Sequence, residues 1–390
     1  MQRTHEMQLE ELLSIDPASI VGRNRAKFDE IAGKCADSIV LAGAGELGRK
    51  ALAGLRRLRV EPLAFADNNP SLWGKVIDGV GVVSPQEAAR RFGTRAVFVA
   101  TVYNGSRVRR QLSELQCSMV TPVAYLFWKY PETFLPHGGL DLPLEIHNGA
   151  DEVRRGLSLW ADEASREEFL AQLKWRYSLD FDALPGPLPI QDIYFPSDLV
   201  SPLPEEVYVD CGAFDGDSIK NFIQARDSVF RLIVAIEADP KNYLNLQETI
   251  KALPGNMQDK IITRQLAVGK EAGRLRFEAM GTAGSRAMPS GGVEVECARL
   301  DDIVRYNKPT YIKMDIEGAE LEALSGAKRI IKDASAVWAI CSYHKQNHLW
   351  KIPQFIQSQS GAYEFYLRRY AEECWELICY AIPKSRLIKR

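Results

Sequence analysis

The sequence predicts an α/β protein built from two doubly wound domains, each with a mostly parallel sheet between helices. The first observation is length, because 390 residues exceed what one ordinary hydrophobic core accommodates. The second is a short apolar strand that leads into a glycine-rich loop and then a helix, a pattern present at 38–48 and again at 207–217. The third is the alternation of strands and helices after each loop. Two Rossmann-like domains are therefore expected.

The first domain is expected over residues 1–135, because its alternating pattern ends where prolines and glycines accumulate. Its predicted strands are 38–42, 62–66 and 96–100, with a hairpin at 75–83 and helices at 49–58, from 85 and from 106. Residues 136–205 are expected to form a helical bridge, from about 151 to 179, followed by a proline-rich linker.

The second domain is expected over residues 206–390. Its final two strands are close in sequence, so one of them is predicted to be antiparallel. Two further strands, at 274–279 and 293–297, are predicted as an insertion before the fourth strand of the series. The seven strands of the main series are 207–210, 232–237, 261–268, 311–315, 337–343, 363–367 and 377–382.

Charge and composition restrict the classes of partner. With 49 basic and 51 acidic residues, the net charge of −2 argues against general binding of nucleic acid or anionic membranes. No apolar run reaches the roughly 18 residues that span a bilayer, so membrane insertion is not expected. Seven cysteines without a C-x-x-C pair indicate free thiols in a reducing cytoplasm. The expected partner is a small-molecule or glycan acceptor. The sequence does not fix the oligomeric state, and a homodimer is one option.

The second glycine loop is acidic, which favours a cofactor without phosphate over a dinucleotide. Asp210, Asp215 and Asp217 would repel a pyrophosphate by about 1 kcal/mol or more for each close pair of charges. S-Adenosylmethionine has no phosphate and carries a sulfonium and an ammonium group, so an acidic loop suits it. Gly212 and Gly216 would allow close approach of the backbone. The alternative is that Asp215 and Asp217 only cap a helix.

An acidic residue at the end of the next strand supports the same cofactor. Glu237 lies 27 positions after Asp210, where a carboxylate accepts both ribose hydroxyls. Asp239 lies close enough to support the adenosine pocket. The predicted cofactor contacts are Asp210, Gly212, Ala213, Phe214, Asp215, Gly216, Asp217, Ser218, Glu237, Ala238, Asp239, Ala267 and Asp315.

Several motifs in this half occur in the order typical of one family. They lie at 209–218, 236–240, 299–302, 312–320, 342–345 and 349–350. Over about 207–383 the chain resembles the FkbM-type methyltransferases. The resemblance implies a seven-stranded class I methyltransferase fold and O-methylation of a hydroxyl on a sugar, a glycoconjugate precursor or a natural product.

Methylation of an alcohol requires removal of its proton, and three residues are predicted to serve this chemistry. Asp315 and Glu317 end one strand and His344 ends the next, so parallel pairing would place them on one rim. His344 is predicted to be the general base, alone or with Asp315, and Glu317 to orient the acceptor or the donor amine. His344 could instead be a structural histidine. The three residues could also bind a divalent ion, but no metal is expected.

The first loop predicts a second nucleotide-type site. Gly43, Gly45 and Gly48 form a complete G-x-G-x-x-G, and Asp67 follows Gly43 by 24 positions. Residues 65–70 and 73–75 resemble the nucleotide-sugar-binding domain of sugar acyltransferases, which implies a nucleotide or nucleotide sugar with Asp67 on a ribose. The alternative is a docking module that binds no ligand.

Two other function classes remain open at this stage. A nicotinamide-dependent oxidoreductase would place its cofactor on the first glycine loop and its substrate in the C-terminal half. A non-catalytic nucleotide-binding module would keep both pockets without turnover. The leading prediction is an S-adenosylmethionine-dependent O-methyltransferase.

Overall fold

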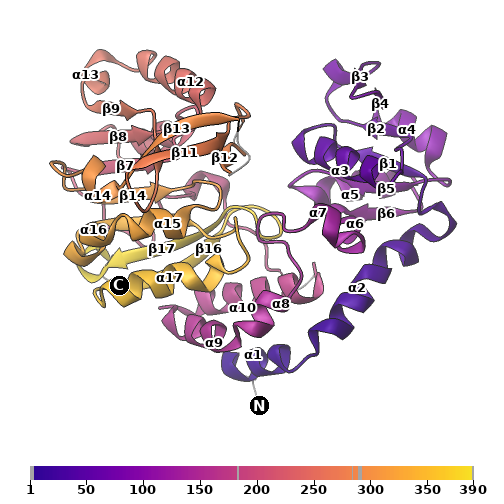
Figure 1. The fold of residues 1–390 in the computed structure, drawn as a ribbon, viewed down its shortest axis with the longest axis horizontal. Helices are drawn as coiled ribbons and strands as arrows, with labels where there is room; N and C mark the ends of the chain where they lie inside the picture. The colour runs from indigo at the N-terminus through magenta and orange to yellow at the C-terminus, as the bar shows by residue number, and fades with distance from the viewer. Residues whose placement is uncertain (1–3, 182–183, 283, 289–291, 389–390) are drawn as a thin grey trace. The chain divides into compact units, whose positions relative to one another are not determined.

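A computed structural model describes residues 4–181, 184–282, 284–288 and 292–388 of the chain (Figure 1). The chain divides into two compact units. Unit 1 comprises Met1–Ala150, Leu170–Pro187 and Ala371–Trp375, and unit 2 comprises Asp151–Phe169, Leu188–Tyr370 and Glu376–Arg390. Each unit contains one large, mostly parallel sheet, which confirms the predicted fold class.

The sheet of unit 1 has six strands in the order β3-β4-β2-β1-β5-β6. All neighbouring strands are parallel except β3 and β4, which form the predicted hairpin. The strands are β1 (Ile39–Ala42), β2 (Ala64–Ala66), β3 (Val76–Ile77), β4 (Val80–Val83), β5 (Val97–Ala100) and β6 (Val120–Pro122). The helices are α1 (His5–Leu13), α2 (Pro17–Ala32), α3 (Glu46–Arg57), α4 (Pro85–Phe92), α5 (Gly105–Glu114), α6 (Val123–Lys129), α7 (Pro131–Phe134) and α8 (Leu144–Asn148).

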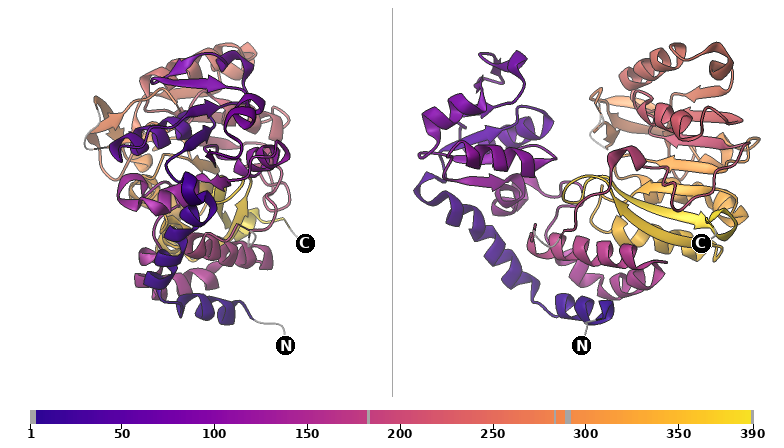
Figure 2. Two further views of the ribbon diagram at one scale, coloured as in Figure 1. Left: turned by 90° about the vertical axis from the view of Figure 1, so that its right-hand side faces the viewer. Right: turned by 180° about the vertical axis from the view of Figure 1, so that it is seen from behind.

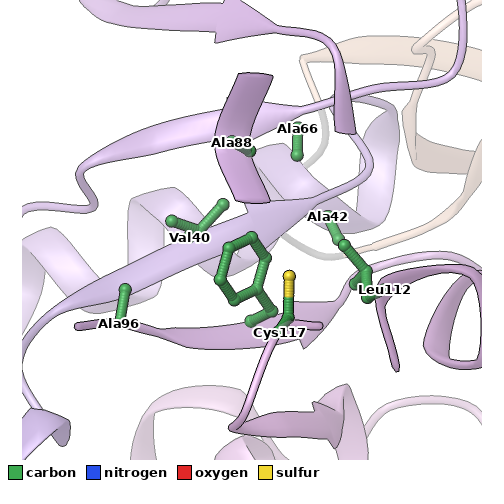
Figure 3. Close-up of a cluster of buried hydrophobic side chains, with 8 residues drawn as sticks. Val40, Ala42, Ala66, Ala88, Ala96, Leu112 and Cys117 are labelled. Carbon is green, nitrogen blue, oxygen red and sulfur yellow. The ribbon is translucent and has the colours of Figure 1, made fainter. Parts of the chain in front are cut away.

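Small side chains let helices pack closely against this sheet. Figure 3 shows Val40 and Ala42 of β1 beside Ala66, Ala88 of α4 and Leu112 of α5, all buried in one apolar cluster. Such a core excludes water from the sheet face and thereby stabilises the order of the parallel strands.

The sequence analysis did not predict α1 and α2. The signal for α2 was nevertheless local, because Asp16 precedes Pro17 at the start of the helix. The Asp16 carboxylate accepts hydrogen bonds from the backbone N–H of Ala18 (3.3 Å) and Ser19 (2.9 Å). An aspartate N-cap followed by proline at the first helical position is a standard start signal.

The sheet of unit 2 has seven strands in the order β16-β17-β15-β14-β7-β8-β9, and Figure 2 shows the yellow terminal strands at one edge. β17 is antiparallel to both of its neighbours, which confirms the prediction for the terminal pair. The strands are β7 (Val207–Cys211), β8 (Leu232–Ile236), β9 (Ile261–Arg264), β14 (Tyr311–Met314), β15 (Val337–Cys341), β16 (Tyr363–Arg369) and β17 (Leu377–Pro383). The helices are α9 (Ala150–Leu159), α11 (Asp217–Ala225), α12 (Pro240–Lys251), α13 (Gly255–Gln258), α14 (Leu300–Ile303), α15 (Glu320–Ser325), α16 (Lys328–Asp333) and α17 (His348–Gln359).

A second, four-stranded sheet in unit 2 corrects one prediction. The strand expected over 261–268 divides, and only β9 pairs with β8. The chain leaves the main sheet at the exposed Arg264 and Gln265, which interrupt the apolar run. β10 (Ala267–Val268) then pairs with the inserted strands in the order β10-β13-β11-β12, where the others are β11 (Gly273–Glu278), β12 (Arg286–Ala287) and β13 (Val293–Ala298).

The predicted helical bridge contains two helices, because the chain breaks between α9 and α10 (Glu163–Ser178). Asp162 starts the second helix by accepting a hydrogen bond from the backbone N–H of Ser165 (2.9 Å). In unit 2, Trp160 packs against Phe169 with ring centroids 5.9 Å apart. The cysteines are all free, and no helix within the described ranges has the length and apolarity needed to cross a bilayer.

Candidate active site

The loop between β7 and α11 comes into backbone contact with the turn that follows β14. Gly212 has a φ of +82°, and a Cβ built there would lie 1.8 Å from the carbonyl oxygen of Asp315. Gly216, with a φ of +87°, lies against the side chain of Thr249. Only glycine adopts these conformations without strain, so the sequence dictates a loop that lies directly on the turn at Asp315.

Glu237, at the end of β8, holds this loop in place. One carboxylate oxygen accepts a hydrogen bond from the backbone N–H of Phe214 (2.9 Å), and the other accepts from that of Asp239 (2.8 Å). Burial raises the pKa of Glu237 to about 7, although these two hydrogen bonds oppose the change. Each oxygen keeps a second lone pair that could accept a hydroxyl hydrogen.

The predicted contact Asp239 is occupied within the fold. Its carboxylate accepts hydrogen bonds from the backbone N–H of Lys241 (2.8 Å) and Asn242 (3.1 Å), which caps α12. Its other oxygen accepts from the backbone N–H of Gly281 (2.9 Å) and from the hydroxyl of Ser285 (2.7 Å). Asp239 therefore connects the segment after β8 to the segment after β11.

Asp210 is fully buried and neutralised by a residue that the sequence analysis did not select. Lys313, in the middle of β14, lies opposite Asp210 in the strand register, with its Nζ 3.2 Å from Asp210 Oδ1. It also donates to the carbonyl of Gly212 (2.6 Å). Burial alone would lower the pKa of Lys313, but Asp210 and Asp315 raise it well above its ordinary value. The hydroxyl of Ser218 donates to the other oxygen of Asp210.

The remaining predicted cofactor contacts are distributed around this loop. Ala213 donates its N–H to the carbonyl of Ile236 (3.0 Å), while Ala238 lies between Glu237 and Asp239. Asp215 accepts from the backbone N–H of Asp217 (3.2 Å), but the N-cap of α11 is Gly216 and it has no side-chain capping hydrogen bond. Ala267 lies in β10 of the second sheet, paired with Cys297.

The structure brings Asp315, Glu317 and His344 together. β14 and β15 are parallel neighbours, so the turns that follow them meet at one rim of the sheet. His344 Nε2 lies 3.4 Å from Asp315 Oδ1 and 3.6 Å from Glu317 Oε1. The hydroxyl of Tyr194 donates to the second oxygen of Asp315 (3.1 Å). These are the three residues that the sequence predicted for the chemistry; their catalytic roles stay predictions.

Glu320 holds the histidine from the opposite side. Its carboxylate is fully buried, lies 2.8 Å from His344 Nδ1 and accepts hydrogen bonds from the backbone N–H of Ile316 and Gly318. Burial lowers the pKa of His344, but Glu320, Glu317 and Asp315 together raise it to about 10. The raised pKa favours the charged form of the ring among these carboxylates, which disfavours His344 as an acceptor of a substrate proton.

Comparison with known proteins identifies this region. Residues 210–371 match the model of a family described as "Methyltransferase FkbM domain". This region is an FkbM methyltransferase domain. The resemblance that the sequence motifs predicted is confirmed for this region, and the chain is an S-adenosylmethionine-dependent methyltransferase.

A solved structure with a TM-score above 0.5 supports the fold, and two others are similar to part of the chain only. A crystal structure of methyltransferase FkbM from Methylobacillus flagellatus KT is 22% identical, with a TM-score of 0.72, covering 94% of this chain and 100% of that one. Aeropyrum pernix fibrillarin with natively bound S-adenosyl-L-methionine is 10% identical, with a TM-score of 0.30, over 48% and 72% of the two chains. A precorrin-6y C5,15-methyltransferase from Geobacter metallireducens GS-15 is 14% identical, with a TM-score of 0.28, over 45% and 78%. No curated protein matches the chain.

The residues around the loop between β7 and α11 are compatible with S-adenosylmethionine, the cofactor that the family implies. The loop at Gly212 approaches without a side chain, and Glu237 offers acceptor lone pairs at the end of β8, where ribose hydroxyls bind in folds of this type. Asp215 and Asp217 leave the loop acidic even though Lys313 neutralises Asp210, and a negative loop suits a cationic cofactor.

The glycine loop of unit 1 has a related construction. The Asp67 carboxylate accepts a hydrogen bond from the backbone N–H of Ala44 (2.8 Å), as Glu237 does from Phe214 in the FkbM domain. A Cβ at Gly43 would lie 2.6 Å from Val102, and one at Gly48 would lie 2.0 Å from the Gly43 carbonyl. Close packing therefore explains why positions 43 and 48 are occupied by glycine.

Three residues near the predicted chemistry were missed: Lys313, Glu320 and Tyr194. Lys313 had a sequence signal, because a lysine flanked by Ile312 and Met314 in a buried strand needs a partner. Glu320 belongs to the recognised motif at 312–320, but its contact with His344 depends on tertiary structure. Tyr194 lies in the segment expected to be a linker and had no signal.

Proposed function

We propose that the FkbM domain transfers a methyl group to a hydroxyl of a sugar, a glycoconjugate precursor or a natural product. S-Adenosylmethionine supplies the electrophilic methyl group when it is bound. The observation that supports an oxygen acceptor is the cluster of Asp315, Glu317 and His344, which adjoins the glycine loop through the contact of Gly212 with the Asp315 carbonyl.

The residues of this cluster suit an acceptor that must lose a proton. An alcohol is a weak nucleophile until its proton is drawn away, and positioned groups contribute about 100-fold or more to such a step. Asp315 Oδ1 is buried and has no hydrogen-bond partner in the described chain, so it is available to an incoming hydroxyl. Glu317 and His344 lie on either side of the same space and would orient the acceptor.

Isotope transfer tests the proposal. The full-length protein is incubated with S-adenosylmethionine labelled in its methyl group and a panel of sugars, glycosides and polyketide alcohols. We expect label on oxygen, and His344→Ala should lower turnover about 100-fold or more while the affinity for adenosylhomocysteine is retained. His147→Ala, an exposed histidine of α8, is the matched control. Label transferred only to nitrogen or carbon acceptors would overturn the proposal.

We also propose that the glycine loop of unit 1 binds a nucleotide or nucleotide sugar, with Asp67 near the ribose. Gly45 favours this interpretation, because it precedes the 12-residue helix α3 and a Cβ there would meet no atom within 4 Å. Packing thus does not require Gly45 to be glycine, whereas close approach of a phosphate would.

A substitution at Gly45 separates ligand binding from folding. The full-length protein is titrated calorimetrically with uridine and adenosine diphosphates and their sugar conjugates. Saturable binding is expected, and Gly45→Val should abolish it with little change in melting temperature. Absence of binding to the unmodified chain would favour the docking-module interpretation.

A further inference from the structure

The chemistry-bearing cluster of the FkbM domain has the composition of a cation site. One ligand atom each from Asp315, Glu317 and His344 lies within 4.8 Å of the others. Two carboxylates and one imidazole are ligands that Mn²⁺ accepts, and a set of three leaves coordination positions open. From this arrangement we propose that Asp315, Glu317 and His344 bind a hard divalent cation of the Mn²⁺ or Mg²⁺ type.

Two buried atoms that make no hydrogen bond point to a ligand independently of the acidic composition. The side chain of His344 is only 5% exposed, yet its Nε2 makes no hydrogen bond to any described residue. Asp315 Oδ1 is buried and lacks a hydrogen bond in the same way. The two atoms face each other at 3.4 Å, which is longer than a good hydrogen bond. A cation between them would satisfy both.

The surroundings of the cluster would orient its members for this role. Glu320 occupies His344 Nδ1, so only Nε2 is left to face Asp315 and Glu317. A carboxylate on the far nitrogen of a histidine is the usual support of a metal ligand, because it fixes both the ring and its tautomer. Glu320 is itself held by two backbone N–H groups. The hydroxyl of Tyr194 donates a hydrogen bond to Asp315 Oδ2, the oxygen that does not face His344.

The cation would give the cluster a role in the chemistry of an alcohol acceptor. It would be held at His344 Nε2 in place of a proton, and its open positions could take the hydroxyl of the acceptor. A hydroxyl bound to a divalent cation is a stronger acid than a free one, so the cation would let its proton pass more readily to a water molecule as the oxygen attacks the methyl group. This chemical role rests on the proposed O-methylation, whereas cation binding itself does not.

Titration with Mn²⁺ tests the site. The full-length protein is freed of metals by chelation and titrated with MnCl₂, with free Mn²⁺ followed by electron paramagnetic resonance. One saturable site is expected, weakened about tenfold or more by His344→Gln and by Asp315→Asn. Glu322→Gln, an exposed glutamate on the same helix α15, is the control and should bind Mn²⁺ as the parent does.

Two further measurements distinguish the possible failures. Adenosylhomocysteine affinity, measured on the same samples, reports the cofactor site and the folding of each variant. No saturable Mn²⁺ binding by a protein that binds adenosylhomocysteine would overturn the cation site and leave the proposed methyl transfer standing. If the variants fold poorly, electron spin-echo modulation of the Mn²⁺-loaded parent protein tests whether His344 is a ligand. An imidazole nitrogen bound to Mn²⁺ gives a nitrogen modulation, and the absence of that modulation would refute His344 as a ligand.

Discussion

Replacing Lys313 by methionine should destabilise the FkbM domain strongly, because it leaves a buried carboxylate without its partner. Lys313 Nζ lies 3.2 Å from Asp210 Oδ1, and the two side chains are 4% and 0% exposed. Methionine keeps most of the apolar volume of the lysine but removes its charge and its hydrogen bond to the carbonyl of Gly212. The change therefore isolates the electrostatic contribution.

The magnitude follows from the burial. Removing one partner of a buried ion pair costs about 3–5 kcal/mol, because the remaining charge is neither solvated nor compensated. For a folding unit of this size, 1 kcal/mol lowers the melting temperature by about 2–4 °C, so Lys313→Met should lower it by about 6–20 °C. Adding Asp210→Asn removes the unpaired charge and should recover more than half of the loss.

Calorimetric melting of the full-length protein measures both effects. Lys251→Met is the matched control, because Lys251 pairs with Glu248 at 2.7 Å with side chains 67% and 72% exposed. An exposed pair of this kind contributes about 1 kcal/mol at most. A Lys313→Met protein that melts with the parent, or a double variant less stable than the single one, would refute the argument from burial.

Three further outcomes are expected. Gly212→Ala should destabilise the FkbM domain by about 2–5 kcal/mol through backbone strain and the clash with Asp315, whereas Gly273→Ala, which meets no atom, should melt like the parent. Burial raises the pKa of Glu237 to about 7, and the ionised carboxylate is the better acceptor for ribose hydroxyls. The affinity for adenosylhomocysteine should therefore fall about tenfold from pH 8 to pH 6. A calorimetric affinity that does not change with pH would contradict this prediction. Asp67→Ala removes the acceptor of two backbone N–H groups and should lower the free energy of unfolding of unit 1 by about 1–3 kcal/mol. Hydrogen exchange of the residue 44 amide should then become faster, and unchanged exchange would contradict this prediction.

The strands and glycine loops were predictable because their signals are local. The apolar segment that became β7 and the glycines after it lie within ten residues of one another, and no distant partner is needed to recognise them. The pairing of Asp210 with Lys313 depends on strand register across about a hundred residues, which periodicity does not encode. The contact of Glu320 with His344 likewise depends on how α15 meets the turn after β15. Division of the segment 261–268 between two sheets required the partner strand β13.

The contact between Gly212 and the Asp315 carbonyl has a thermodynamic consequence for the order of events in catalysis. It joins the segment that we propose receives the methyl donor to the turn that we propose faces the acceptor, with no side chain between them to absorb a displacement. Any molecule that shifts one segment on binding must change the free energy of the other, and the two affinities must change by the same factor. Occupancy by the donor would thereby tune affinity for the acceptor, and loss of the methyl group would alter how firmly the product is held.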